Sequence, residues 1–124
     1  MENHLLLYIG SALTIIWGIA HLFPTKSVVN DFGDISVDNR RIIAMEWITE
    51  GVALIFIGVL VGAVTMVDPI HRVSKVVYGV AIGCLLTLAL VSLFTGFRIR
   101  FLPFRLCPFI FTASAVLIFI GGLL

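Results

Sequence analysis

The apolar stretch Ile42–Val67 limits what this chain can fold into more than any other feature. It is long enough to cross a bilayer, because about 20 helical residues span a hydrocarbon core of about 30 Å. Glu46 and Glu50 nevertheless lie near its start, four residues apart, so both project from one face of the predicted helix. A carboxylate at membrane depth costs about 2.5–3.5 kcal/mol. The pair therefore needs a partner, a shared proton or a position near the interface.

The composition argues against a soluble domain and against a nucleic-acid-binding protein. Hydrophobic residues make up 60% of the 124 residues and charged residues 12%, whereas soluble domains have about 45–50% and about 25%. The formal net charge of +1 lacks the basic excess of a nucleic-acid binder. The length predicts a single domain over residues 1–124. No catalytic, phosphate-binding or dinucleotide-binding motif occurs, so an autonomous enzyme is not indicated and no cofactor is named by the sequence.

The hydropathy pattern predicts an all-α polytopic membrane protein, an antiparallel bundle of four transmembrane helices. The expected spans are about Leu5–Phe23, Ile42–Val67, Val73–Phe97 and Leu106–Leu124. The polar connector 24–41 contains apolar residues at helical spacing and predicts a short interfacial helix that ends at Gly33. Asp68 and Pro69 predict the N-cap and first residue of the third span.

Two Gly-x-x-x-Gly motifs, Gly58/Gly62 and Gly79/Gly83, predict close helix packing. We expect them to serve packing within the chain first and a homodimer second. The stripe of Gly51, Gly58 and Gly62 lies about 100–140° around the helix from the two acids. One face of the second span therefore suits close packing, and another carries the carboxylates.

The basic residues predict an orientation. Six of the eight Lys and Arg residues follow the first and third spans, and these are Lys26, Arg40, Arg41, Arg98, Arg100 and Arg105. The positive-inside rule places both of these loops in the cytoplasm. We expect an integral protein of the bacterial inner membrane.

Polar and aromatic residues from three spans are expected at this same membrane face. The candidate ligand-binding residues are Trp17, His21, Glu46, Trp47, Glu50 and Arg98. A metal site is not indicated, because iron carboxylate bundles use Glu-x-x-His pairs and the acids here form Glu-x-x-x-Glu with one nearby histidine. The acidic residues of the connector, Asp31, Asp34 and Asp38, are interpreted as solvated caps and turn residues.

Three interpretations of this polar group compete. A binding pocket for an amphiphile such as a quinone or a lipid would combine aromatic walls with a few convergent polar groups. A small proton-coupled transporter working as a dimer would use a buried acid that exchanges protons with its substrate. In a purely structural membrane subunit, Glu46 or Glu50 would pair with Arg or His of a neighbouring helix and determine the helix register.

The segments WGIAHLFP and MEWITEGVALIFIGVLVGAVTM, within Trp17–Met66, resemble the DoxX-like superfamily of small four-helix membrane proteins. The resemblance covers about half of the chain. The arginine often found before the first span in that superfamily is missing here. The resemblance implies a non-enzymatic accessory subunit of a membrane redox system, in some members linked to quinone, with another membrane protein as its partner. By this resemblance, Glu46, Glu50 and Gly51 are the positions expected to match functional positions of the superfamily.

Overall fold

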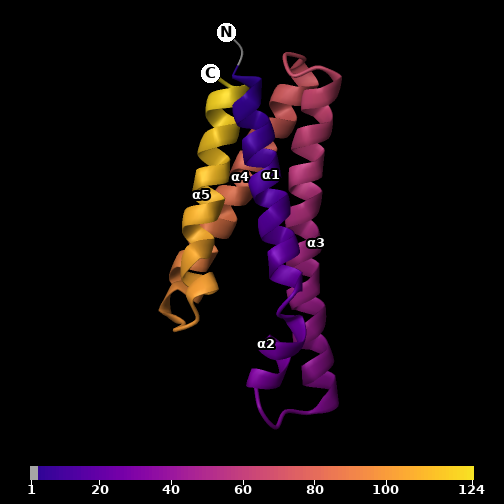
Figure 1. Cartoon of the computed structure of the whole chain (residues 1–124), viewed down its shortest axis with the longest axis vertical. Coiled ribbons are helices and arrows are strands. Elements are labelled where there is room, and N and C mark those ends of the chain that lie inside the picture. The colour runs from indigo at the N-terminus through magenta and orange to yellow at the C-terminus, as the bar shows by residue number, and fades with distance from the viewer. Residues whose placement is uncertain (1–2) are drawn as a thin grey trace.

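The computed structural model describes residues 3–124, which form a bundle of helices (Figure 1). The elements in chain order are α1 (His4–Leu22), α2 (Thr25–Asp31), α3 (Val37–Val67), α4 (Arg72–Phe94), the 3₁₀ turn η1 (Gly96–Arg98) and α5 (Leu102–Gly122). Four of them, α1, α3, α4 and α5, are long and apolar enough to cross a membrane. The predicted all-α bundle of four helices is confirmed, and this supports an integral membrane protein. Helix α2 lies at one end of the bundle, and the described N-terminal and C-terminal helix ends lie at the other.

Helix α3 begins at Val37, five residues before the predicted membrane span Ile42–Val67. The Ser36 hydroxyl caps it by accepting a hydrogen bond from a backbone N–H of the first turn at 3.1 Å. Before this cap, Gly33 has φ of 71°, a left-handed conformation that glycine adopts at no steric cost. The Arg40 guanidinium donates to the Gly33 carbonyl at 3.1 Å and closes the turn. With 31 residues, α3 is about 46 Å long, so its start extends beyond a hydrocarbon core of about 30 Å.

Helix α3 ends at Val67 as predicted, but the predicted cap of α4 at Asp68 was wrong. Helix α4 begins at Arg72, and its N-cap is His71, whose Nδ1 accepts a hydrogen bond from the Val73 N–H at 3.2 Å. Asp68 lies before this cap and accepts from the N–H groups of Ile70 and His71 at 3.0 and 3.2 Å. These bonds to residues two and three positions ahead form an Asx-type turn. The Asp68 carboxylate therefore stabilises the turn, and His71 caps α4.

The connection between α4 and α5 also differs from the predicted bounds. Helix α4 ends at Phe94 and α5 begins at Leu102, each about one helical turn earlier than predicted. Pro103 lies in the first turn of α5, where its missing N–H removes no helical hydrogen bond. Pro108 lies inside the same helix. A proline there leaves a carbonyl without its usual donor, which helices in membrane proteins tolerate.

Helix α1 packs against both α3 and α5, whereas α3 and α4 contact each other less. The α1–α3 contact is close at Gly58, whose carbonyl accepts a hydrogen bond from the Ser11 hydroxyl at 2.6 Å. A Cβ atom at Gly58 would lie only 2.5 Å from Ile15 Cγ1. This motif therefore packs within the chain as predicted. Gly79 and Gly83 do not, because an added Cβ at either would have no neighbour within 4 Å among the described residues.

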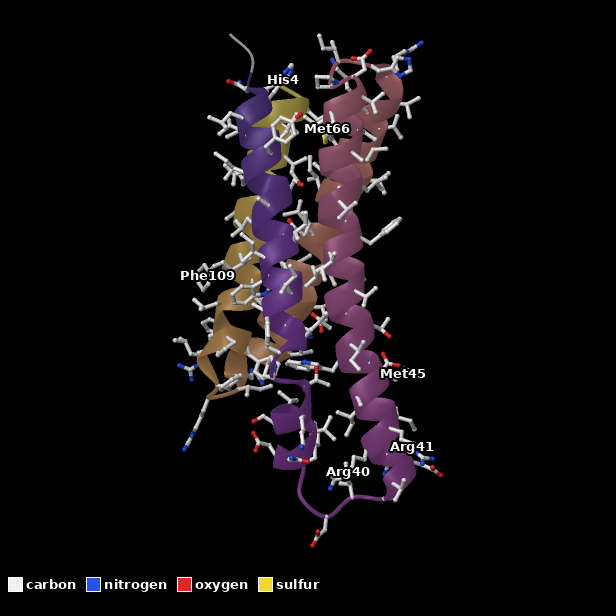
Figure 2. All side chains as sticks on the ribbon, turned by 45° about the vertical axis from the view of Figure 1, so that its right-hand side comes forward. His4, Arg40, Arg41, Met45, Met66 and Phe109 are labelled. Atoms are coloured by element: carbon white, nitrogen blue, oxygen red, sulfur yellow. The ribbon has the colours of Figure 1, made fainter. Side chains whose placement is uncertain are left out.

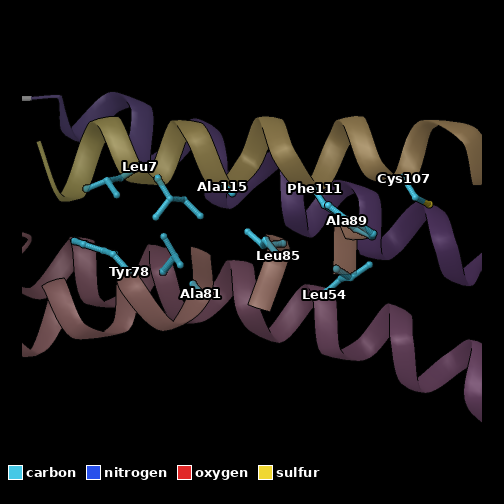
Figure 3. Close-up of a cluster of buried hydrophobic side chains, with 11 residues drawn as sticks. Leu7, Leu54, Tyr78, Ala81, Leu85, Ala89, Cys107, Phe111 and Ala115 are labelled. Carbon is cyan, nitrogen blue, oxygen red and sulfur yellow. The ribbon is translucent and has the colours of Figure 1, made fainter. Parts of the chain in front are cut away.

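The core is a narrow column of apolar side chains between the helices (Figure 3). Its fully buried members include Leu7, Leu54, Tyr78, Leu85 and Phe111. Many large apolar side chains are exposed on the outside, and Figure 2 shows Met45, Met66 and Phe109 there. Soluble monomers rarely expose apolar surface on this scale. The outer surface of this bundle therefore suits contact with lipid chains.

Candidate functional site

A large groove lies at the end of the bundle that carries α2. Its volume is about 840 Å³, within the range of about 300–1,000 Å³ that ligand pockets occupy. Figure 1 shows α3 diverging from α5 toward this end. The residues that line the groove come from α2 and its two ends, from α3, and from α4 through to the start of α5, and they are Pro24, Ser27, Val28, Asp31, Phe32, Ile42, Ile43, Glu46, Trp47, Thr49, Glu50, Ala53, Leu88, Ile99, Phe101 and Phe104.

The two acids of α3 both lie on the wall of this groove. Glu46 is exposed and makes no hydrogen bond or ion pair with any described residue. The Glu50 side chain is 39% exposed, and its Oε2 lies 3.4 Å from His21 Nε2. This separation is long for a hydrogen bond, and the imidazole nitrogen is accordingly without a hydrogen-bond partner. Glu50 therefore has a contact within the bundle, whereas Glu46 faces only the groove and its mouth.

Trp47 joins the groove to α1. At 100° per residue it lies between the acid-bearing face and the glycine face of α3, so it can reach both sides. Its Nε1–H donates to the His21 carbonyl at 2.7 Å, and its ring stacks on the His21 imidazole with centroids 3.9 Å apart and planes at 16°. The Phe104 ring from α5 lies edge-on to the Trp47 ring, with the two ring centroids 5.4 Å apart. These rings form a continuous wall across α1, α3 and α5.

A smaller cavity of about 130 Å³ lies on the other side of this wall. Trp17, His21 and Cys107 line it, and it shares Trp47 and Phe104 with the groove. His21 Nε2 is buried and makes no hydrogen bond within residues 3–124, whereas the buried Trp17 Nε1 lies beside the Cys107 thiol. Buried polar atoms in native proteins nearly all have a hydrogen-bond partner. A polar group, either water or part of a ligand, fits this cavity.

The structure divides the predicted site residues into three sets. Glu46, Trp47 and Glu50 line the groove, and Trp17 and His21 lie behind it in the smaller cavity together with Trp47. Arg98 lies at the same end of the bundle, in η1, but it is exposed and lines neither cavity.

The early end of α4 accounts for the position of Arg98. The chain turns through η1 there, so that the later residues Ile99 and Phe101 line the groove.

The sequence interpretation missed several residues of the groove. Asp31 was interpreted as a solvated turn residue, and it is exposed, yet it lines the groove from α2. Phe101 and Phe104 were not singled out, although the aromatic composition of segment 97–104 was a usable signal. The contact of Phe104 with Trp47 and the position of Phe101 in the groove depend on how the segment after α4 folds back, which no local pattern specifies.

A residue count along α3 places the groove near one membrane boundary when Val67 is taken as the opposite boundary. About 20 residues of helix cross the hydrocarbon core, and counting back from Val67 this length ends near Ile48. Trp47 therefore lies at the depth where tryptophan is enriched in membrane proteins. Glu46 lies on the aqueous side of this level, and Glu50 lies just inside it. The groove spans the interface between headgroups and hydrocarbon.

Within residues 3–124, no three His, Cys, Asp or Glu side chains are grouped so that they could hold a metal ion. No family model, curated protein or solved structure matches the chain. The resemblance to the DoxX-like superfamily stays a prediction, and the functional argument rests on the groove and its lining residues.

Proposed function

We propose that this small integral membrane protein is a non-enzymatic accessory or binding subunit that holds an amphiphile in the groove. The observation that carries this proposal is a ligand-sized groove at the membrane boundary whose lining is mainly apolar and aromatic but contains carboxylates. Along α3 the lining begins with Ile42 and Ile43, continues through Glu46 and Glu50 and ends at Ala53, so the carboxylates lie between apolar stretches. A molecule with a polar end and an apolar body fits this lining when its polar end lies at the carboxylates.

The proposal also includes the membrane, the orientation and the partner of this subunit. A DoxX-like subunit of the bacterial inner membrane would have the groove at its cytoplasmic face, since the basic loops lie at the α2 end of the bundle. Such a subunit would deliver or retain its amphiphile, a lipid or a quinone, for a second membrane protein.

A purely structural role is the second candidate, because Glu50 lies 3.4 Å from His21 and Trp47 donates to the His21 carbonyl. Both contacts join α1 to α3 and would hold their register. This role predicts that Glu50→Gln lowers the thermal stability and leaves bound molecules unchanged. It assigns no role to Glu46, which has no partner among the described residues. Glu46 therefore separates the two candidates.

The test compares organic extracts of purified wild type, Glu46→Gln and Glu50→Gln by mass spectrometry. The reference is the lipid composition of the solubilised membrane, so that bulk lipid is subtracted. As a matched control, Asp34→Asn removes a carboxylate at the same end of the bundle but outside the groove.

If the groove binds an amphiphile, one small molecule is enriched in wild type and Asp34→Asn and is depleted in Glu46→Gln at unchanged thermal stability. Identical extracts from all variants, with only Glu50→Gln less stable, would support the structural role instead.

A further inference from the structure

The ionisable side chains that line the groove are all acidic. Asp31, Glu46 and Glu50 lie on its wall, and no Lys, Arg or His is among its lining residues. They come from two different helices, Asp31 from α2 and the two glutamates from α3, so carboxylates border the groove on both of these helices. This arrangement is unlike the chain as a whole, which has a formal net charge of +1.

The Lys and Arg residues at this end of the bundle are absent from the groove lining, and two of them are held by backbone carbonyls. The Arg40 guanidinium donates to the Gly33 carbonyl at 3.1 Å, and Arg105 Nε donates to the Ile99 carbonyl at 3.1 Å. Arg98 is exposed outside the groove. These cations therefore leave the groove carboxylates without a basic partner on the wall.

Among the described residues, His21 is the one basic group within ion-pair distance of a groove carboxylate. Its side chain is only 7% exposed, and it lies behind Trp47 on the wall of the smaller cavity. Its Nε2 is directed toward Glu50 without making a hydrogen bond. Even a charged His21 would offset a single carboxylate, and Glu46 and Asp31 would remain uncompensated.

Aromatic rings line the same groove. Trp47, Phe32, Phe101 and Phe104 contribute to its wall. A cation within about 6 Å of an aromatic ring centroid is attracted by the ring, whereas an anion is not. Carboxylates and aromatic rings together favour a positively charged ligand. An anionic headgroup would be repelled by the carboxylates of both α2 and α3.

We propose that the polar end of the bound amphiphile is positively charged, an amine or a quaternary ammonium group on an apolar body. Its cationic end would lie among Asp31, Glu46 and Glu50, and its apolar part would follow Ala53 and Leu88 into the hydrocarbon. This inference rests on the proposed function, since it names the chemical class of the ligand for the same groove. A positively charged head group disfavours quinones and anionic lipids as ligands of the groove.

The test uses three probes that share a saturated twelve-carbon chain and differ in the charge of the head group. They are dodecyltrimethylammonium, dodecanol and laurate. Each is titrated calorimetrically into the full-length protein in a nonionic detergent, with protein-free micelles as the blank. The variants are Glu46→Gln, the double variant Glu46→Gln/Glu50→Gln, and Asp34→Asn as the control outside the groove. Glu46→Gln keeps the test decisive if the double variant does not fold, because Glu46 makes no ion pair or hydrogen bond with another described residue.

We expect dodecyltrimethylammonium to bind wild type about tenfold tighter than dodecanol, which corresponds to about 1.4 kcal/mol. Glu46→Gln should reduce this preference severalfold, and Asp34→Asn should keep it. If dodecanol or laurate binds as tightly as the cation, the charge assignment is overturned while amphiphile binding stands. If no probe binds above the micelle blank, both the assignment and the proposed function fail.

Discussion

Replacing Gly58 with alanine tests the contact between α1 and α3 on which the site depends. The added Cβ would lie 2.5 Å from Ile15 Cγ1 and 2.7 Å from the Ser11 carbonyl oxygen. The Ile15 side chain can rotate away, but the Ser11 carbonyl belongs to the backbone of α1. The two helices must therefore separate, and the hydrogen bond from the Ser11 hydroxyl to the Gly58 carbonyl lengthens or breaks.

The magnitude follows from these contacts. Overpacking in a close-packed interior costs about 1–3 kcal/mol, and a hydrogen bond between transmembrane helices contributes about 0.6 kcal/mol on average. Alanine offsets at most about 1 kcal/mol through its higher helix propensity. We expect Gly58→Ala to lower the free energy of unfolding by about 1–3 kcal/mol, most of it from overpacking.

The measurement is reversible unfolding in mixed micelles, followed by circular dichroism. Gly79→Ala is the matched control, because its Cβ would have no neighbour within 4 Å and only the helix propensity changes. Its free energy of unfolding should stay the same or rise by up to about 1 kcal/mol. Equal stabilities of Gly58→Ala and Gly79→Ala would refute the close approach of α1 and α3.

Two further predictions address the site and its orientation. Trp47→Phe keeps a ring against His21 but removes the Nε1–H donor, so the free energy of unfolding should fall by about 1 kcal/mol; an unchanged value would show that this hydrogen bond does not hold α3 to α1. In a cysteine-free background, Lys26→Cys and Arg105→Cys should react with an impermeant thiol reagent from the same side of sealed vesicles, and Ile70→Cys from the opposite side, because the first two lie at the α2 end. Labelling of Lys26→Cys and Arg105→Cys from opposite sides would contradict the antiparallel bundle.

Much of the site could be predicted because it depends on geometry within one helix. A period of about 100° per residue places Glu46 and Glu50 on one face of α3 and Gly58 on another. These faces do line the groove and pack against α1, respectively. The placement of His21 near Glu50 also agrees with the order of the spans, since an antiparallel bundle brings the end of α1 beside the start of α3.

Other parts of the site could not be predicted from local patterns. Arg98 was expected at the ligand, but the turn after α4 leaves it exposed and brings Phe101 to the groove instead. Gly79 and Gly83 have the same spacing as Gly58 and Gly62, yet no described residue packs against them. A small-residue motif shows that a helix face permits close approach, and it does not show which helix occupies that face.

The sequence by itself determined that this chain is a four-helix membrane protein, because the length and hydropathy of each span depend only on neighbouring residues and on the thickness of the bilayer. It also determined that two carboxylates share one helix face near an end of the bundle. Only the tertiary structure decided that α3 diverges from α5 and opens a groove, and that Trp47 and Phe104 close its inner side. The physical reason is that angles between helices result from the packing of all their side chains at once, whereas the period of a helix is a property of its backbone alone.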